Sequence, residues 1–128
     1  MSMEADLTAY MMRSGAITAL IGTRFEPVQN VQSTTMPAVS YQVISAPVAY
    51  SHSGAGLHTW RVQVTTVAAT FAEMLAVAGA VKDALAGLRW AGAGGVYASF
   101  VENMTDGLAS SAGQMGYYLR RMDVMIEL

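Results

Sequence analysis

The sequence predicts a single α+β domain, with a mostly antiparallel sheet of about four strands and one long helix and an N-terminal helix packed on one face. The first observation is a change of period within residues 58–88. Apolar residues alternate over 60–67, the two-residue repeat of a strand with one buried face, and then recur at helical spacing over 71–88. The second is that three further stretches also alternate. One-sided strands combined with separate helices are typical of this fold class.

The junction between strand and helix carries a capping signal. Thr70 is expected to accept from the Glu73 amide, and the Glu73 carboxylate to reach back to the Thr70 amide. Gly87 stands where a helix ends in a left-handed residue. The expected buried stripe consists of Phe71, Met74, Leu75, Ala78, Val81, Leu85 and Leu88.

The N-terminal part predicts a helix over 4–13 and a short helical turn over 16–21. The first helix begins with acids, including Asp6, which the helix dipole favours in the first turn. Residues 23–28 are expected to be extended, and Pro27 limits them to a short or edge strand.

The other strands are expected over 38–45, 88–91, 96–104 and 117–128, with a turn at 91–95. Between them, 48–57 predicts an extended arm or loop, and 105–116 predicts a flexible loop in which Asp106-Gly107 is a turn signal. A strand–helix–strand link across 58–104 would be right-handed if its strands were parallel neighbours.

Arg120 falls on the apolar face of the last strand. The pattern leaves three interpretations open: an ion pair, a contact between subunits, or a bulge that turns the side chain to solvent.

Composition excludes several classes of function. The 128 residues, taken as one domain over 1–128, contain no cysteine, which excludes disulfides and thiolate chemistry. The chain has no signal-peptide pattern and no apolar run of ~18 residues, so no membrane span is expected. A net charge of −2 without a basic cluster lacks the electrostatic signature of a nucleic-acid binder.

Charged residues are scarce. They make up 12% of the chain, against about 25% in an ordinary soluble domain. An alanine-rich composition accounts for part of this. The interpretation we favour is that much of the surface is buried against other copies or partners.

The side of the expected long helix that faces away from the buried stripe carries unusually small residues. Its residues are Ala72, Ala76, Gly79, Ala80, Ala84 and Ala86. Such a face lets another element approach closely, and the pattern leaves open whether this is the first helix or a neighbouring subunit.

No catalytic, cofactor or metal site is predicted. His52 and His58 are six residues apart around a loop, which favours surface histidines over metal ligands. In Ser51-His52-Ser53, adjacent side chains do not point at each other, so the segment does not form a nucleophile–base pair. The glycines at 92, 94 and 95 lack the Lys-Ser/Thr of a phosphate loop.

Five motifs in order carry a resemblance to a known family. They are ALIGTRFEP at 19–27, MPAVSY at 36–41, WRVQV at 60–64, VKDALAG at 81–87 and LRRMDV at 119–124. In these motifs the chain resembles the tail completion or tail terminator (head–tail joining) proteins of long-tailed phages and related gene transfer particles.

The resemblance implies a virion structural protein of the tail, assembled in the host cytoplasm and not an enzyme. It implies a homo-oligomeric ring, commonly of six copies, that ends growth of the tail tube. The implied partners are the tail tube protein and a head–tail connector or head-closure protein, with DNA only passing through the lumen. Combined with the arm, the loop and the small helix face, it gives candidate contact residues Tyr50, His52, Ala76, Gly79, Ala80, Leu108, Met115 and Arg120.

A second hypothesis is a small-ligand-binding or adaptor α+β domain that acts as a homo-oligomer. It requires an apolar pocket with convergent polar groups, which the sequence does not supply.

Overall fold

The computed structural model describes residues 3–27, 36–46, 48–50, 56–109 and 117–128, with the backbone alone at 48–50, 56–57, 88 and 108–109. Its helices are α1 (Met3–Met12), α2 (Gly15–Ile21) and α3 (Phe71–Leu85). Its strands are β1 (Phe25–Pro27), β2 (Ala38–Ser45), β3 (Val48–Tyr50), β4 (Gly56–Ala68), β5 (Leu88–Gly92), β6 (Gly95–Ala109) and β7 (Tyr117–Glu127).

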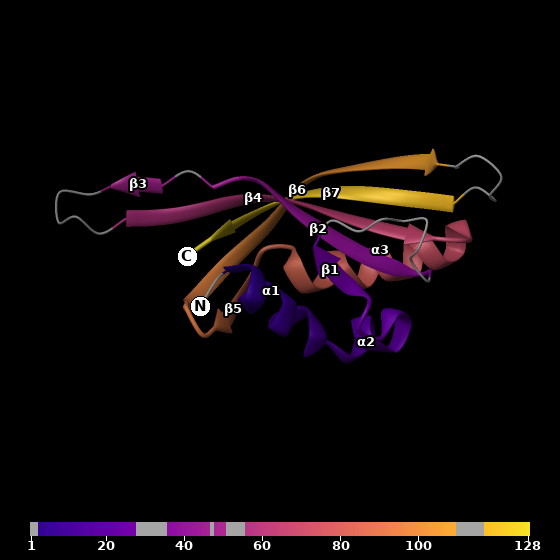
Figure 1. Ribbon diagram of the computed structural model, residues 1–128, viewed down its shortest axis with the longest axis horizontal. Helices are drawn as coiled ribbons and strands as arrows, with labels where there is room; N and C mark the ends of the chain where they lie inside the picture. The colour runs from indigo at the N-terminus through magenta and orange to yellow at the C-terminus, as the bar shows by residue number, and fades with distance from the viewer. Residues whose placement is uncertain (1–2, 28–35, 47, 51–55, 110–116) are drawn as a thin grey trace.

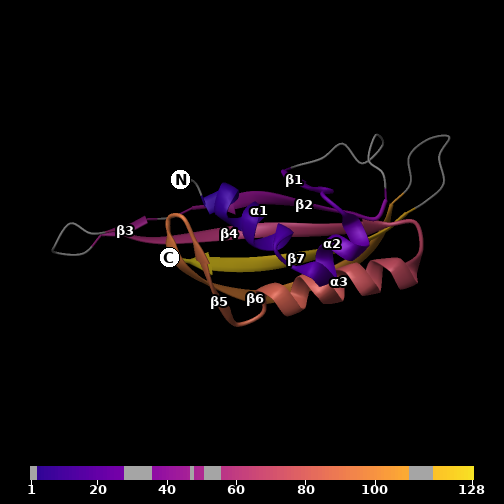
Figure 2. The ribbon, with the colours of Figure 1, turned by 90° about the horizontal axis from the view of Figure 1, so that it is seen from below.

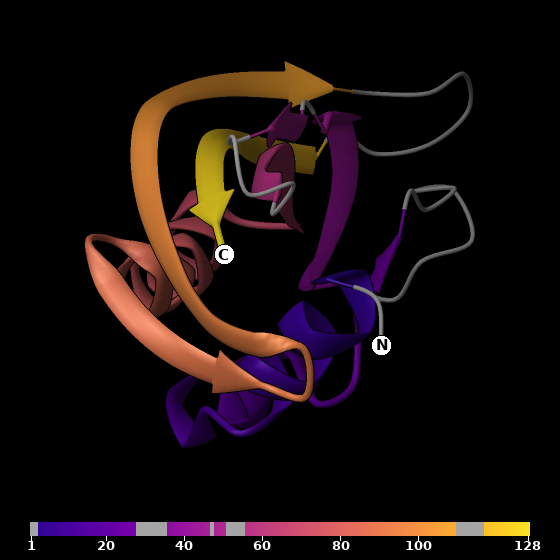
Figure 3. The same ribbon diagram turned by 90° about the vertical axis from the view of Figure 1, so that its left-hand side faces the viewer.

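The strands form one strongly twisted sheet. Its order is β1-β2-β4-β7-β6-β5, and β3 pairs with the start of β4. All neighbours are antiparallel except β1 and β2. The mostly antiparallel α+β class is therefore confirmed, whereas the expected count of about four strands is too low. The short strands β1, β3 and β5 add to the four long ones at the margins of the sheet (Figures 1 and 3). Of these, β1 lies within the extended segment expected over 23–28, and β5 matches the strand expected over 88–91.

The C-terminal strand enters the middle of the sheet. β7 pairs with β4 along one side and with β6 along the other. Consequently β4 and β6 run parallel but are not neighbours, and the link through α3 and β5 passes over β7. The two longest strands, β4 and β6, are thus joined to each other only through Tyr117–Glu127 among the described strands.

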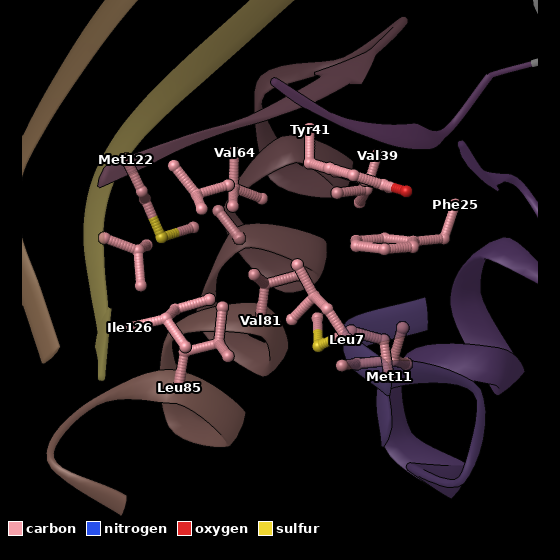
Figure 4. Close-up of a cluster of buried hydrophobic side chains, with 14 of the residues drawn as sticks. Leu7, Met11, Phe25, Val39, Tyr41, Val64, Val81, Leu85, Met122 and Ile126 are labelled. Carbon is pink, nitrogen blue, oxygen red and sulfur yellow. The ribbon is translucent and has the colours of Figure 1, made fainter. Parts of the chain in front are cut away.

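All three helices cover the same face of the sheet, as predicted for α1 and α3 (Figure 2). The core lies between them and the strands. Figure 4 shows Leu7 and Met11 of α1 and Val81 and Leu85 of α3 meeting the inward side chains of β2, β4 and β7. The alternation read from the sequence is confirmed there, since Val62, Val64, Met122, Val124 and Ile126 are all buried.

The buried stripe of α3 is rotated from the expected one. Met74, Ala78, Val81 and Leu85 are buried as predicted, but Val77 joins them. Phe71 and Leu75 were expected in the core and are 47% and 41% exposed. The reason is that α3 also packs against α2, and Ala80 and Ala84 pack against the core on that flank, which turns the opposite flank to solvent.

The ends of α3 follow their local signals. The Glu73 amide donates to Thr70 Oγ1 over 3.2 Å, as expected for an N-cap. The return contact differs, because the Thr70 hydroxyl donates to Glu73 Oε1 at 3.4 Å. The helix ends at Leu85 with Ala86 as its C-cap, and Gly87 follows with a left-handed φ of 66°, as expected for the residue that ends this helix. Leu88, the last residue of the expected apolar stripe, instead begins β5.

Two ribbons extend the sheet at opposite ends of the long axis (Figure 1). One is β3 with the start of β4, where Tyr50 pairs with Gly56. The other is the end of β6 with the start of β7, where Ala109 pairs with Tyr117. The expected arm over 48–57 is thus partly a strand pair, and residues 51–55 lie outside the described residues.

The expected loop over 105–116 is wrong for its first five residues. Thr105–Ala109 continue β6, and Asp106-Gly107 sit opposite Arg120 and Leu119 instead of forming a turn. A complete row of backbone partners on β7 overrides the local turn preference of an Asp-Gly pair. Residues 110–116 lie outside the described residues.

Candidate assembly surface

The described candidate contact residues lie in three places, which are the β3–β4 ribbon, the β6–β7 ribbon and α3. Tyr50 lies on β3 and Leu108 on β6, so they belong to the two opposite ribbons. His52 and Met115 lie outside the described residues. Ala76, Gly79 and Ala80 are on α3, and Arg120 is on β7. The structure therefore does not gather them into one patch.

Arg120 is held in a two-pronged ion pair across the β6–β7 ribbon. Its Nε donates to Asp106 Oδ1 over 2.6 Å and its Nη2 to Asp106 Oδ2 over 2.9 Å. The hydrogen bonds and charge of the guanidinium lower the pKa of Asp106, and the pKa of Arg120 is raised for the same reason. β7 pairs with β4 without a register shift here, so of the three interpretations the ion pair is the one observed. The ion pair joins β6 and β7 through their side chains within this ribbon.

The small face of α3 is divided between the interior and the surface. Ala80 packs against the core, and the Tyr10 hydroxyl of α1 donates to the Ala84 carbonyl over 2.5 Å. This part is covered within the chain. Ala76 is exposed, and an added Cβ at Gly79 would meet nothing within 4 Å.

An exposed apolar flank of α3 was missed by sequence reasoning. Phe71 contacts Tyr118 of β7 edge to face, with ring centroids 5.7 Å apart, and Leu75 lies one turn further along. Next to it, a groove runs between α3 and β6, lined by Lys82, Val101, Glu102, Asn103 and Met104. Apolar periodicity alone could not show which side of the stripe lacks a covering element.

The long strands leave two edges of the sheet open. β5 pairs with β6 only from Gly95 to Ser99, and no other described strand pairs with that side of β6 beyond it. On the opposite margin, β1 covers β2 only from Val39 to Tyr41. Unpaired backbone N–H and C=O groups at such edges are templates for another strand. Sequence reasoning did not foresee them, because it could not assign neighbours.

Asp6 is the most constrained charged side chain of the described residues. It is 3% exposed, and its carboxylate accepts from the Ala93 amide over 3.1 Å, the Gly94 amide over 3.0 Å and the Tyr97 hydroxyl over 2.6 Å. These bonds lower the pKa of Asp6, the Tyr97 bond foremost. A Cβ at Gly92 would lie 2.7 Å from Asp6 Cγ, so the approach requires glycine. The group fastens α1 to the β5–β6 turn; the sequence had indicated only a helix-dipole role.

No catalytic or metal constellation is visible in the described residues. His58 lies in β4 and stacks on Trp60 with ring centroids 5.6 Å apart. Within the described ranges, no three His, Asp or Glu side chains come together in a metal-binding arrangement. The described helices are also too short or too polar to cross a bilayer.

Comparisons with known proteins place the chain. Residues 5–106 match the family described as tail completion protein gp17. The fold is similar to that of a chain in the structure of the virion of the native gene transfer agent (GTA) particle, with a TM-score of 0.68 and 18% identity over 98% of this chain and 92% of that chain. The comparison with curated proteins gives no match. Because the family match spans most of the sequence, this chain belongs to the tail completion protein gp17 family, a structural family of the phage tail.

Proposed function

We propose that this protein forms a ring, of six copies, at the head-proximal end of the tail tube. There it ends tube growth and presents a surface to the head connector or head-closure protein, with DNA passing through the lumen. The whole chain, 1–128, acts as one domain in this ring, and the ring performs no catalysis.

The observation that carries the proposal is the family match over residues 5–106, since it assigns the chain to tail completion. The structure adds support of a different kind. Two β-ribbons leave the sheet in opposite directions, which suits a protein that must contact one partner on each side (Figure 1). The scarcity of charge suits a surface that is largely buried on assembly.

The candidate contacts divide between the two directions. Tyr50 belongs to the β3–β4 ribbon, and Leu108 and Arg120 belong to the β6–β7 ribbon. His52 and Met115 stay candidates from the sequence alone, since they lie outside the described residues. We propose that one of the two ribbons contacts the tail tube and the other contacts the connector. Ala76, Gly79 and Ala80 are proposed contacts between copies, of which Ala76 and Gly79 have space for a neighbour.

The described grooves give the ligand-binding alternative little support. The one beside α1 is lined by Tyr10, Arg13, Ser14, Ala84, Arg89, Trp90 and Ala91. The groove is open to solvent, and Arg13 Nη2 donates to the Ala91 carbonyl over 2.9 Å. A small-molecule site would instead enclose its ligand.

Electron microscopy of the purified protein, alone and mixed with tail tubes, tests the proposal. Rings that increase with protein concentration, and extra density capping one end of each tube, are expected. Monomers at every concentration together with bare tube ends would refute it. Tubes capped at both ends would leave the ring intact but contradict the head-proximal assignment.

A further inference from the structure

We propose that neighbouring copies join by extending one continuous sheet. The open edge of β6, residues 100–109, pairs antiparallel with the open edge formed by β2 and β3 of the next copy, residues 42–45 and 48–50. This inference rests on the proposed ring and names the surface and the partner from which the ring is built.

The β6 edge is long and available. Ten residues follow the last one that β5 covers, and their other side is already bonded to β7, which holds the strand in position. Two apolar side chains on this segment are exposed, Phe100 at 44% and Met104 at 36%. A rigid edge with exposed apolar side chains pays little ordering entropy when a second strand docks.

The matching edge lies on the other margin of the same sheet. After Tyr41, β2 has no described neighbour on its outer side, and β3 continues the same line along β4. Ile44 is 49% exposed on this segment. The two open edges therefore have similar lengths, and each presents an exposed apolar residue.

Strand direction makes the two edges complementary. β2 is antiparallel to β4, β4 to β7 and β7 to β6, so β2 and β6 run in opposite directions. A second copy placed in the same orientation beside β6 brings its β2 alongside in the antiparallel sense. The alternating strand direction of the sheet thus continues from one copy to the next, with both copies in the same orientation.

This contact is heterologous, since a different surface is used on each copy, and repeated contacts of that type give a ring when the rotation between copies closes. The open parts lie at opposite ends of the sheet, so successive copies are staggered along the strands. In a closed assembly such stagger is accommodated by strands tilted to the axis, as in barrels.

Both edges also carry an irregularity that limits uncontrolled pairing. The register shifts between Val101 and Asn103 on β6 and between Val43 and Ser45 on β2. Bulges of this kind are common at edges, where they discourage indiscriminate strand addition. On β6 the irregularity lies beside the groove next to α3, whose lining includes Val101, Glu102 and Asn103.

Cysteine cross-linking tests the pairing directly, because the natural chain has no cysteine. Gln42, Ser45, Asn103 and Thr105 are exposed, and their row partners place all four on the face of the sheet without helices. One β2 position and one β6 position are changed to cysteine in the full chain, in the four possible combinations. A short bismaleimide is then added to assembled protein.

The expected result is a ladder of covalent multimers for at least one combination, such as Gln42→Cys with Thr105→Cys. Mixing the two single variants should give dimers only, and each single variant alone should give none. Dimers from Thr105→Cys alone would mean that β6 pairs with β6, which overturns the proposal. Rings that form normally but give no cross-link in any combination would also overturn it, while leaving the proposed function intact. If the parent protein neither forms rings nor caps tubes, the proposed function itself fails.

A pair of lysine variants provides an independent test. Phe100 and Val96 are four residues apart in β6, so their side chains lie on the same face of the sheet. Val96, however, sits opposite Ala91 in the part of β6 that β5 covers. Phe100→Lys places a charge on the open edge and should weaken ring assembly by roughly tenfold or more. Val96→Lys, at a position 61% exposed, should change it by less than about twofold. Both variants should unfold like the parent, and equal effects on assembly would exclude the β6 edge as the contact.

Discussion

At the scale of single residues, the best-defined interaction is a buried carboxylate that no motif announces. Asp6 collects three donors from the β5–β6 turn and from Tyr97. Burial and the Asp6 hydrogen bond raise the pKa of Tyr97 to about 12. The pair therefore joins the first helix to a hairpin some ninety positions later along the chain, and both partners prefer the protonation states that they have at neutral pH.

The pH dependence of stability should report this pair. The pKa of Asp6 is lower in the fold than in the unfolded chain, so its contribution is present above about pH 4 and is lost as the pH falls through the folded pKa. The pKa of Tyr97 is raised, so its contribution is present below about pH 10 and is lost as the pH rises towards 12. Thermal unfolding across this range measures both.

The matched variants are Asp6→Asn and Tyr97→Phe. Asp6→Asn should lower the Tm by several degrees at pH 7, and its deficit should shrink near pH 3. Tyr97→Phe should lower the Tm at pH 7 and reduce the alkaline decline, of which a part remains because burial also raises the pKa of Tyr10. Tyr10→Phe, which removes a half-exposed hydroxyl bonded to a neutral carbonyl, should have a smaller effect. An Asp6→Asn variant with a constant deficit from pH 7 to pH 3 would contradict the assignment.

At the scale of elements, α3 shows which parts of a pattern are local. The cap at Thr70 and the left-handed Gly87 depend on neighbours within one turn, and both were predicted. The direction in which the helix faces depends on α1 and α2, so Phe71 and Leu75 were wrongly assigned to the core. The small face likewise proved to be two surfaces, one covered by the chain itself and one exposed.

Glutamate substitutions separate those two surfaces. Gly79→Glu enters open space and replaces the poorest helix former but proline, so monomer stability should be unchanged or rise by up to ~0.8 kcal/mol. If copies meet on this face, ring assembly should weaken by about tenfold or more. Ala80→Glu forces a carboxylate against the core and should cost about 1–3 kcal/mol. Denaturant unfolding and sedimentation measure the two effects.

Gly79→Ala is the control for the first variant, since it changes helix propensity without adding charge or length. If Gly79→Glu and Gly79→Ala assemble into rings equally well, α3 is not part of the contact between copies. The contact is then made by the sheet edges alone.

At the scale of the whole molecule, the last strand, β7, joins the two halves of the sheet. β7 lies between β4 and β6, and it supplies Met122, Val124 and Ile126 to the core. The sequence pattern showed that the last strand belongs to the sheet, and this is confirmed. Its central position could not be read from the pattern, because alternation reports which face is buried and not which strand is the neighbour.

Deleting residues 123–128 should abolish cooperative unfolding. Val124 and Ile126 each contribute about 1.5–3 kcal/mol by burial, and the backbone bonds to two neighbouring strands are lost with them. That is comparable with the ~5–15 kcal/mol that hold an ordinary domain together. Removing Leu128 alone, which is 42% exposed, should leave a cooperative transition. Circular dichroism during heating distinguishes the two, and a folded 1–122 fragment would contradict the central role of β7.

The sequence by itself determined the α+β class, the one-sided strands, the helix caps and the resemblance to tail completion proteins, because each depends on local chemistry or on the order of motifs. Only the tertiary structure decided the order of the strands, the rotation of α3, the Asp6 and Arg120 pairings and the two open edges. Those features arise where segments far apart in the chain meet, and no local period encodes which segments those will be.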